Sequence, residues 1–225
     1  MSPLELYLLS IENVKILDKS INYNEYISLD LSIGNESFLN ENLKSSQDFE
    51  NFITKKLLQS NAKVAYGGYN EIRNLYKRST IFNSLNKDSR TIHIGLDLWT
   101  NANTNVLAAL DGTIHSFKFN EGLGNYGPTI IIEHKTFNLT FYTLYGHLSK
   151  KSIENCKIGQ EFKKGEVLAT LGTSEVNGDY APHLHFQIIE NLEDKKGDYY
   201  GVCSEKDLNY YLKNCPNPNL LLKIK

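Results

Sequence analysis

The chain has 225 residues, of which 40% are hydrophobic and 22% are charged, values that are ordinary for a globular protein. Its formal net charge of −2 and the absence of a polybasic segment argue against nucleic acid or an anionic membrane as a partner. No segment approaches the roughly 20 apolar residues that span a membrane, and the N-terminus lacks the basic region of a signal peptide. We therefore expect a cytoplasmic protein, with reduced cysteines at positions 156, 203 and 215.

Residues 1–65 differ in pattern from the rest of the chain and are expected to form a small α+β extension with no chemistry of its own. Alternation of apolar and polar residues over 25–35 predicts a half-buried strand. A helical pattern follows over 45–60, for which Ser45 or Ser46 is the expected N-cap.

Residues 66–90 are expected to connect this extension to the rest of the chain and to lie beside a cleft. The segment begins with a Gly- and Tyr-rich stretch that fits a connecting loop and strand. It also fits one wall of the cleft, with Arg73 placed to bind a substrate carboxylate through two nitrogens of its guanidinium group.

From about residue 91 onward, short apolar segments alternate with turn signals such as Asp111-Gly112 and Gly165. This spacing is typical of an antiparallel sheet, so we expect a mainly β domain over 91–190, built as a sandwich or an open barrel. The expected strands are 91–99, 105–110, 113–119, 128–134, 139–148, 166–172 and 183–189.

Residues 191–225 are expected to form a C-terminal tail with one helix over 204–214. Ser204 is its expected N-cap, with Asp207 three residues further on. The sequence CPNPN at 215–219 should end this helix.

Two of the six histidines, His183 and His185, stand two positions apart within the apolar sequence DYAPHLHFQII. On a strand, residues i and i+2 point to the same face, about 6.6 Å apart along the chain. Both side chains should therefore enter one cavity. A His-x-His pair is a weak motif by itself, so its meaning depends on which other residues reach that cavity.

His93 and Asp97 are the best candidates to do so. A catalytic zinc takes three protein ligands from His, Asp or Glu and keeps a fourth position open for water. In a straight strand the Cα atoms of His93 and Asp97 would be about 13 Å apart. They reach one ion only if this segment is helical or bends, and Gly95 lies between them, where a bend costs least.

The order of these motifs resembles the lysostaphin/LytM-type zinc peptidases, peptidase family M23. His-x-x-x-Asp at 93–97, Tyr-x-His-Leu at 145–148 and His-Leu-His-Phe at 183–186 follow the order of that family. The resemblance includes the segments VLAALDGTIHSF, GPTIIIEHKTFNLTFYTLYGHLS and KIGQEFKKGEVLATLGTS. It covers about residues 91–190.

The resemblance implies a lysostaphin-type fold, one zinc ion per chain and hydrolysis of Gly- or D-Ala-containing peptidoglycan-type peptides. It implies that His93, Asp97 and His185 bind the zinc ion, and that His147 and His183 are catalytic residues beside it. A neutral imidazole can take a proton from the attacking water, and an N–H-donating imidazole can stabilise the oxyanion. Either histidine could fill either role.

Three further side chains, those of Arg73, Tyr145 and His134, are expected to contact the substrate, whereas His115 is expected to have no chemical role. In a latent form, Asn70 or Glu71 could occupy the open position on the zinc.

The sequence departs from the family pattern near the histidine pair. The loop TSEVNGDYAPHLHFQ lacks the usual G-x-S-T-G, and Gln187 stands where Glu is common, which leaves the substrate preference open. A zinc-containing module that binds peptides or regulates another protein without cleaving them is an alternative. A histidine phosphocarrier or a biotinyl- or lipoyl-type domain is a third possibility, but it gives Asp97 no role.

Overall fold

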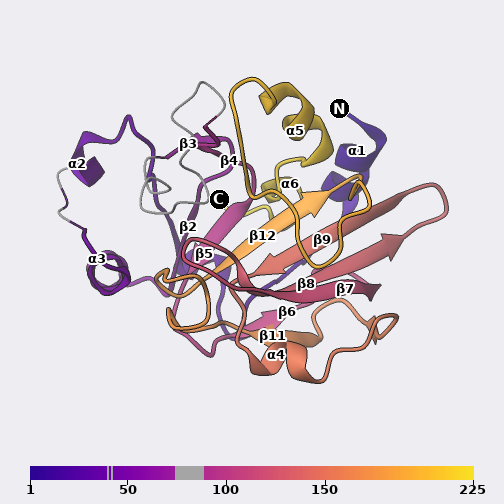
Figure 1. Cartoon of the computed structure of the whole chain (residues 1–225), viewed down its shortest axis with the longest axis horizontal. Coiled ribbons are helices and arrows are strands. Elements are labelled where there is room, and N and C mark those ends of the chain that lie inside the picture. Colours follow the sequence, from indigo (N-terminus) through magenta and orange to yellow (C-terminus); the bar gives the residue numbers. More distant parts are fainter. Residues whose placement is uncertain (40, 42, 74–88) are drawn as a thin grey trace.

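The computed structural model describes residues 1–39, 41, 43–73 and 89–225, so residues 74–88 of the expected connecting segment lie outside the described residues. The helices of the described chain (Figure 1) are α1 (Pro3–Ser10), a 3₁₀ turn (Tyr23–Glu25), α2 (Glu36–Leu39), α3 (Ser46–Gln59), α4 (Lys151–Glu154), α5 (Leu208–Asn214) and α6 (Asn219–Leu222). The strands are β1 (Tyr26–Ser28), β2 (Val64–Gly67), β3 (Glu71–Ile72), β4 (Ile92–His93), β5 (Leu96–Trp99), β6 (Asn105–Leu107), β7 (Gly112–Asn120), β8 (Gly127–Lys135), β9 (Thr140–Gly146), β10 (Glu161–Phe162), β11 (Val167–Thr170), β12 (His183–Ile189) and β13 (Val202–Cys203). None of the described helices is long and apolar enough to cross a membrane.

The largest sheet has eight strands in the order β1-β2-β5-β12-β9-β8-β7-β10. All neighbouring strands in it are antiparallel except β1 and β2, which are parallel. Two smaller sheets, β11-β6 and β13-β4-β3, lie beside it. The sheet is open, and the expected mainly β fold is confirmed, with one parallel pair added to the antiparallel arrangement.

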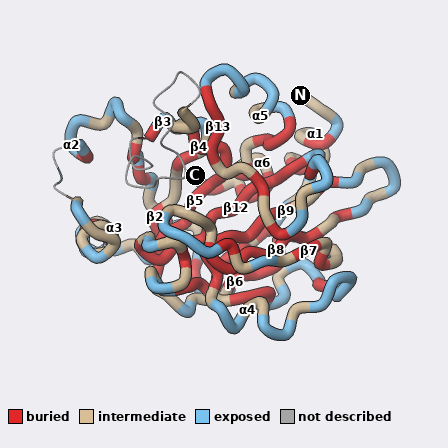
Figure 2. Tube along the Cα trace, viewed as in Figure 1, coloured by how far each residue is buried: buried red, intermediate tan, exposed pale blue. Residues whose placement is uncertain are grey.

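Both faces of the sheet are covered, so the neighbouring strands β5 and β12 are buried at every position. In β12 every residue is buried. Leu184, Phe186 and Ile188 enter the main hydrophobic core on one face, while His183 and His185 point to the other. Figure 2 shows this burial running through β5, β12, β9 and β8, with exposure concentrated in the loops. The period of two in a strand therefore separates the core from the histidine face.

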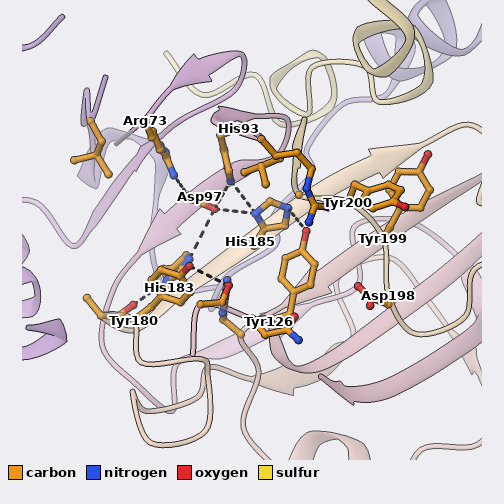
Figure 3. Close-up of a pocket in the computed structure, with 18 of the residues that line it drawn as sticks. Arg73, His93, Asp97, Tyr126, Tyr180, His183, His185, Asp198, Tyr199 and Tyr200 are labelled. Atoms are coloured by element: carbon orange, nitrogen blue, oxygen red, sulfur yellow. Dashed lines mark hydrogen bonds and ion pairs between the residues drawn. The ribbon is translucent and has the colours of Figure 1, made fainter. Parts of the chain in front are cut away.

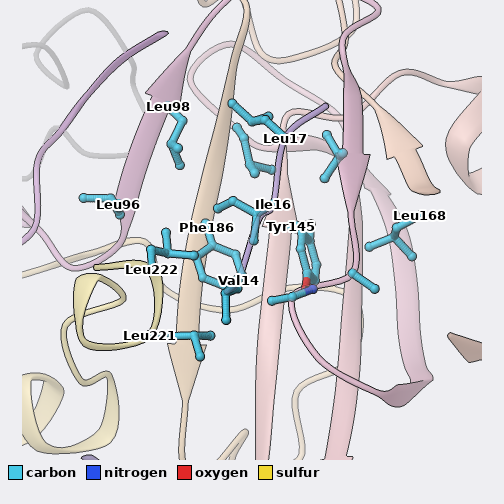
Figure 4. Packing of buried hydrophobic residues seen from close by; sticks show 14 of the residues in the cluster. Val14, Ile16, Leu17, Leu96, Leu98, Tyr145, Leu168, Phe186, Leu221 and Leu222 are labelled. Carbon is cyan, nitrogen blue, oxygen red and sulfur yellow. The ribbon is translucent and has the colours of Figure 1, made fainter. Parts of the chain in front are cut away.

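The N-terminal extension contributes directly to the main core. Leu8 and Ile16 are fully buried there together with Phe186, and Figure 4 shows Val14, Ile16 and Leu17 packed against residues of the sheet. Helix α1, which the sequence pattern did not reveal, begins with a capping box in which Ser2 and Glu5 exchange hydrogen bonds.

The strand expected over 25–35 is much shorter, since β1 ends at Ser28 and pairs only with β2. Beyond it Leu31 is still buried but Ile33 is 44% exposed. The alternation of apolar and polar residues therefore continues past the end of the strand. The helix expected over 45–60 is confirmed as α3, and Ser45 caps it through a hydrogen bond from the Asp48 amide.

The C-terminal helix begins later than expected. Ser204 and Asp207 do exchange hydrogen bonds, but they close a turn, and α5 starts at Leu208. A short helix, α6, follows the Pro-containing break and returns Leu221 and Leu222 to the main core.

The segment expected as one strand over 91–99 is divided at Gly95. The part before the break, β4, belongs to the small three-stranded sheet, and the part after it, β5, belongs to the large sheet. This bend brings His93 and Asp97 together at the same point.

Candidate metal and catalytic site

A cleft of about 390 Å³ lies over the histidine face of β12. Its floor is formed by β5 and β12, and the loops before β8 and β13 form walls beside them. Figure 3 shows the labelled side chains of Arg73, His93, Asp97, His183 and His185 gathered on this floor.

Three side-chain atoms converge at the centre of the cleft: Nε2 of His93, Oδ1 of Asp97 and Nδ1 of His185. The two nitrogens are 3.0 Å apart. The carboxylate oxygen lies 3.3 Å from His93 Nε2 and 3.1 Å from His185 Nδ1. All three side chains are buried. This is a group of residues that could hold one metal ion.

The hydrogen bonds behind the two imidazoles show which atoms face the centre. His93 donates its Nδ1–H to the carbonyl oxygen of Gly68, 2.9 Å away, and this leaves a lone pair on Nε2. His185 Nε2 lies 3.0 Å from Gln187 Oε1, an acceptor, which leaves the lone pair on Nδ1. Burial lowers the pKa of His93 to about 4, so its ring is neutral near pH 7. Two nitrogen lone pairs and a carboxylate thus face one point, an arrangement that a cation stabilises.

The second oxygen of Asp97 binds Arg73. The guanidinium Nη1 donates to Asp97 Oδ2 at 2.6 Å, and its Nε donates to Glu71. Although burial acts to raise the pKa of Asp97, the neighbouring His93 and Arg73 hold that pKa well below its usual range. Arg73 is therefore in the wall of the cleft, as expected, where it fixes the carboxylate. Its contact with a substrate stays a prediction.

His147 and His183 form a second pair beside the three converging atoms, and their ring centres are 4.2 Å apart. His147 donates its Nδ1–H to Asn177 O at 2.8 Å, and His183 donates its Nδ1–H to Ala181 O at 2.8 Å. Each ring consequently presents Nε2, with a lone pair, on the side away from the backbone. Nε2 of His183 is 3.9 Å from Asp97 Oδ1.

Both rings of this pair are neutral near pH 7. Burial lowers the pKa of His183, and burial together with the neighbouring His183 and His185 lowers the pKa of His147 well below its usual range. His147 also has a left-handed backbone with φ of 61°, held by hydrogen bonds from its amide to Tyr126 O and from Gly172 N to its carbonyl. Non-glycine residues in this conformation are uncommon and concentrate at functional sites.

The structure does not bring Tyr145 and His134 to the cleft. Tyr145 pairs with Phe186 across the sheet and shares its core-facing side, where its hydroxyl accepts a hydrogen bond from the Ala109 amide. His134 donates to Asp111 O and accepts from the Thr143 hydroxyl. The period of two in β8 and β9 explains both placements, since these positions alternate away from the histidine face.

The Glu71 carboxylate is bound to neighbours other than the three converging atoms, and Asn70 lies in the turn before it. Glu71 accepts hydrogen bonds from the Leu31 amide and from Arg73. Asn70 occupies a left-handed turn with φ of 55° between β2 and β3. His115, expected to have no chemical role, lies against Ser116 and Tyr142 on β7 and β9.

Several residues that line the cleft were not predicted from the sequence. Tyr126 places its hydroxyl 3.3 Å from His185 Nε2, and Lys195 and Tyr200 line the same cleft. The last two follow residue 190, the expected end of the β domain. The Gly-rich sequence EGLGNYG before β8 was the available sign that Tyr126 lies in a functional loop.

The model of peptidase family M23 matches residues 91–197, which include His93, Asp97, His147, His183 and His185. Over these residues the chain is similar to peptidase family M23.

Two curated relatives each match about 100 residues of this chain. The peptidoglycan DD-endopeptidase ShyC of Vibrio cholerae is 34% identical over 100 residues, which are 44% of this chain and 20% of the relative. An uncharacterized metalloprotease of Haemophilus influenzae is 33% identical over 99 residues, which are 44% of this chain and 19% of that protein. The matched region thus spans about a fifth of the length of each relative.

Among solved structures, the catalytic domain of the antimicrobial peptidase lysostaphin from Staphylococcus simulans matches with 23% identity. The match covers 75% of this chain and 98% of that domain, with a TM-score of 0.40.

Proposed function

We propose that this protein is a zinc-dependent peptidase that hydrolyses a peptide bond in peptidoglycan-type peptides. The observation that carries the proposal is the convergence of His93 Nε2, Asp97 Oδ1 and His185 Nδ1, with the Nε2 atoms of a neutral histidine pair beside them.

Zinc suits these ligands. A tetrahedral zinc ion binds nitrogen and oxygen ligands at about 2.0–2.2 Å, so two ligand atoms lie about 3.3–3.6 Å apart. The separations in this site, 3.0, 3.1 and 3.3 Å, are near the lower end of that range. Two imidazoles and one carboxylate leave one tetrahedral position open, as catalytic zinc sites do.

The chemistry divides between the metal and the histidine pair. Zinc, when bound, acts as a Lewis acid that polarises a carbonyl oxygen and makes water a stronger acid. His147 and His183 each present a basic Nε2, so either ring can accept the proton of the attacking water. The ring that becomes protonated can then donate to the oxyanion or to the departing amine. The backbone carbonyls of Asn177 and Ala181 hold the two rings in place during this transfer.

The substrate class rests on the relatives and on the shape of the cleft. One relative is a peptidoglycan DD-endopeptidase, and the family model covers every residue that we place at the metal or in the histidine pair. The cleft, with a volume of about 390 Å³, is lined by aromatic side chains such as Trp99, Tyr180 and Tyr200. Such surfaces suit the backbone and short side chains of Gly- and D-Ala-containing peptides.

The test is cleavage by His147→Ala and His183→Ala variants. Removal of either imidazole should lower the turnover number about 10²- to 10⁴-fold, the range typical of general acid–base groups. Both variants should still bind one zinc ion, because neither residue is among the three converging atoms. Cross-linked muropeptides and Gly-rich peptides are the substrates, new amino termini are measured, and zinc is measured by elemental analysis.

His115→Ala is the matched control, since this histidine lies outside the cleft. It should cleave and bind zinc as the unchanged protein does. Unchanged turnover in His147→Ala and His183→Ala would refute the proposed mechanism. Binding of these peptides by the zinc-loaded protein, without cleavage of any of them, would favour the non-catalytic binding module instead.

A further inference from the structure

Gln187 is fully buried on β12, two residues after His185 and on the same face. Its side chain makes three contacts. Oε1 lies 3.0 Å from His185 Nε2, while the amide nitrogen lies 3.1 Å from Tyr200 O and 3.2 Å from Cys215 Sγ. Every hydrogen-bonding group of this amide is thereby directed at a neighbour.

The orientation of the amide follows from these neighbours. The Tyr200 carbonyl can only accept a hydrogen bond, so the amide nitrogen of Gln187 must face it. Oε1 must then face His185, and an amide oxygen can only accept. His185 therefore carries its hydrogen on Nε2, and its lone pair lies on Nδ1, the atom that faces His93 and Asp97.

A competing tautomer of His185 shows why this matters. With the hydrogen on Nδ1, the ring would donate to Asp97 Oδ1, 3.1 Å away, and Nε2 could accept from the Tyr126 hydroxyl, 3.3 Å away. That state satisfies the ring but removes the lone pair that a metal needs. Gln187 opposes it, because the amide oxygen and an unprotonated Nε2 would then place two lone pairs 3.0 Å apart.

We infer that Gln187 is a positioning residue that selects the metal-binding tautomer of His185. The inference rests on the proposed metal centre. It also gives the segment after β12 a role, since the Tyr200 carbonyl by itself requires this orientation of the amide and Tyr200 follows the strand that carries His185. Residues that orient a metal-binding imidazole typically contribute 10- to 100-fold to metal affinity.

The test compares zinc affinity and the tautomer of His185 in Gln187→Leu. This variant keeps a similar volume but has no acceptor. Its zinc affinity, measured by competition with a chelator, should fall about 10- to 100-fold. In the metal-free full chain, the ¹⁵N chemical shifts of the His185 ring should move from the Nε2–H toward the Nδ1–H tautomer.

Two further variants separate this role from a structural one. Gln187→Glu restores an acceptor, so the Nε2–H tautomer and a zinc affinity within a few-fold of the original should both return. Cys215→Ala removes one contact of the amide nitrogen but leaves Oε1 and Tyr200 in place, and should change neither quantity.

The inference is overturned if Gln187→Leu binds zinc as tightly as the unchanged chain and keeps His185 in the Nε2–H form. It is equally overturned if His185 in the unchanged, metal-free chain is found in the Nδ1–H form. This measurement does not depend on whether Gln187→Leu folds. A failure of the proposed function gives a different result. In that case the unchanged chain binds no zinc, whichever tautomer His185 adopts.

Discussion

His93, His147, His183 and His185 share one arrangement at the scale of the single residue. Each ring directs one N–H at an oxygen within the protein and turns its other nitrogen toward the cleft. Three of these acceptors are backbone carbonyls and the fourth belongs to Gln187. Because the carbonyls are set by the fold, the tautomers of His93, His147 and His183 are determined before any ligand arrives.

Residue chemistry predicted part of this arrangement. The spacing of His183 and His185 indicated a shared cavity, and their proximity in the cleft agrees with that. The carbonyls of Gly68 and Asn177 could not be anticipated, because a backbone acceptor carries no residue-type signal. Arg73 was expected near the cleft, but its ion pair with Asp97 depends on the tertiary approach of β3 to β5.

His134 gives a prediction of how stability depends on pH. Burial lowers the pKa of His134 to about 4 from an unfolded value near 6.5. The unfolded chain therefore binds a proton at a higher pH than the folded chain does. The stability that depends on the neutral ring is full above pH 6.5 and is lost as the pH falls toward 4. Between pH 7 and 5 this single group should lower the free energy of unfolding by about 2 kcal/mol.

The measurement is urea unfolding of the metal-free protein at pH 7 and 5. His134→Gln keeps a donor for Asp111 O and an acceptor for Thr143 but cannot titrate. Its free energy of unfolding should fall by about 2 kcal/mol less over this interval than that of the unchanged chain. Equal losses in the two proteins would show that His134 is not a buried neutral histidine.

At the scale of the element, the break at Gly95 positions two of the three converging side chains. A bend or a helix was expected here if the two residues share a metal ion, because a straight strand would hold His93 and Asp97 too far apart. The sequence could not show that β4 leaves the large sheet for a smaller one, since that depends on pairing with β3 and β13.

Alanine at Gly95 should disturb the metal centre directly. Its Cβ would lie 2.4 Å from His185 Cε1, closer than non-bonded atoms approach, so the ring must move. The backbone of Gly95 is outside the left-handed region, and alanine itself is therefore tolerated there. We expect Gly95→Ala to lower zinc affinity at least about 10-fold, as judged by competition with a chelator.

Gly34→Ala is the matched control. The nearest atom to its new Cβ is Ser32 Oγ at 3.7 Å, and its backbone is likewise outside the left-handed region. Zinc affinity should be unaltered. If Gly95→Ala also bound zinc with unaltered affinity, the close approach of this bend to His185 would not control the site.

Other elements were predicted unevenly for identifiable reasons. Strands with turn signals on both sides, such as β8 and β9, were placed within a few residues. Helix α1 was missed because its burial is confined to Leu4 and Leu8, which leaves little amphipathic pattern in eight residues. The start of helix α5 was predicted too early, because Ser204 and Asp207 resemble a capping box but close a turn.

At the scale of the whole molecule, the first 65 residues are joined to the β domain through a common core. Leu4, Leu8, Ile16 and Leu17 are each at most 2% exposed and lie in the cluster that contains Phe186. Burial of four such side chains stabilises a fold by about 6–12 kcal/mol. That is comparable to the whole free energy of unfolding of a typical domain, about 5–15 kcal/mol.

A chain beginning at residue 66 should therefore lack a cooperative unfolding transition and should bind a dye that recognises exposed apolar surface. In the full chain, Leu8→Ala should lower the free energy of unfolding by about 2–5 kcal/mol. Leu58→Ala is the control, because Leu58 is 77% exposed and should have an effect below about 0.5 kcal/mol. Cooperative unfolding of the shortened chain, with full stability, would show that the extension is an independent unit.

The central claim is that the convergence of His93, Asp97 and His185 serves zinc-dependent hydrolysis. The most direct measurement is the release of new amino termini from cross-linked muropeptides by the full chain, after chelation and again after addition of zinc. We predict no release by the metal-free protein and full recovery at one zinc ion per chain. Release that continues without metal, or one bound zinc with no cleavage of any muropeptide or Gly-rich peptide, would contradict the account.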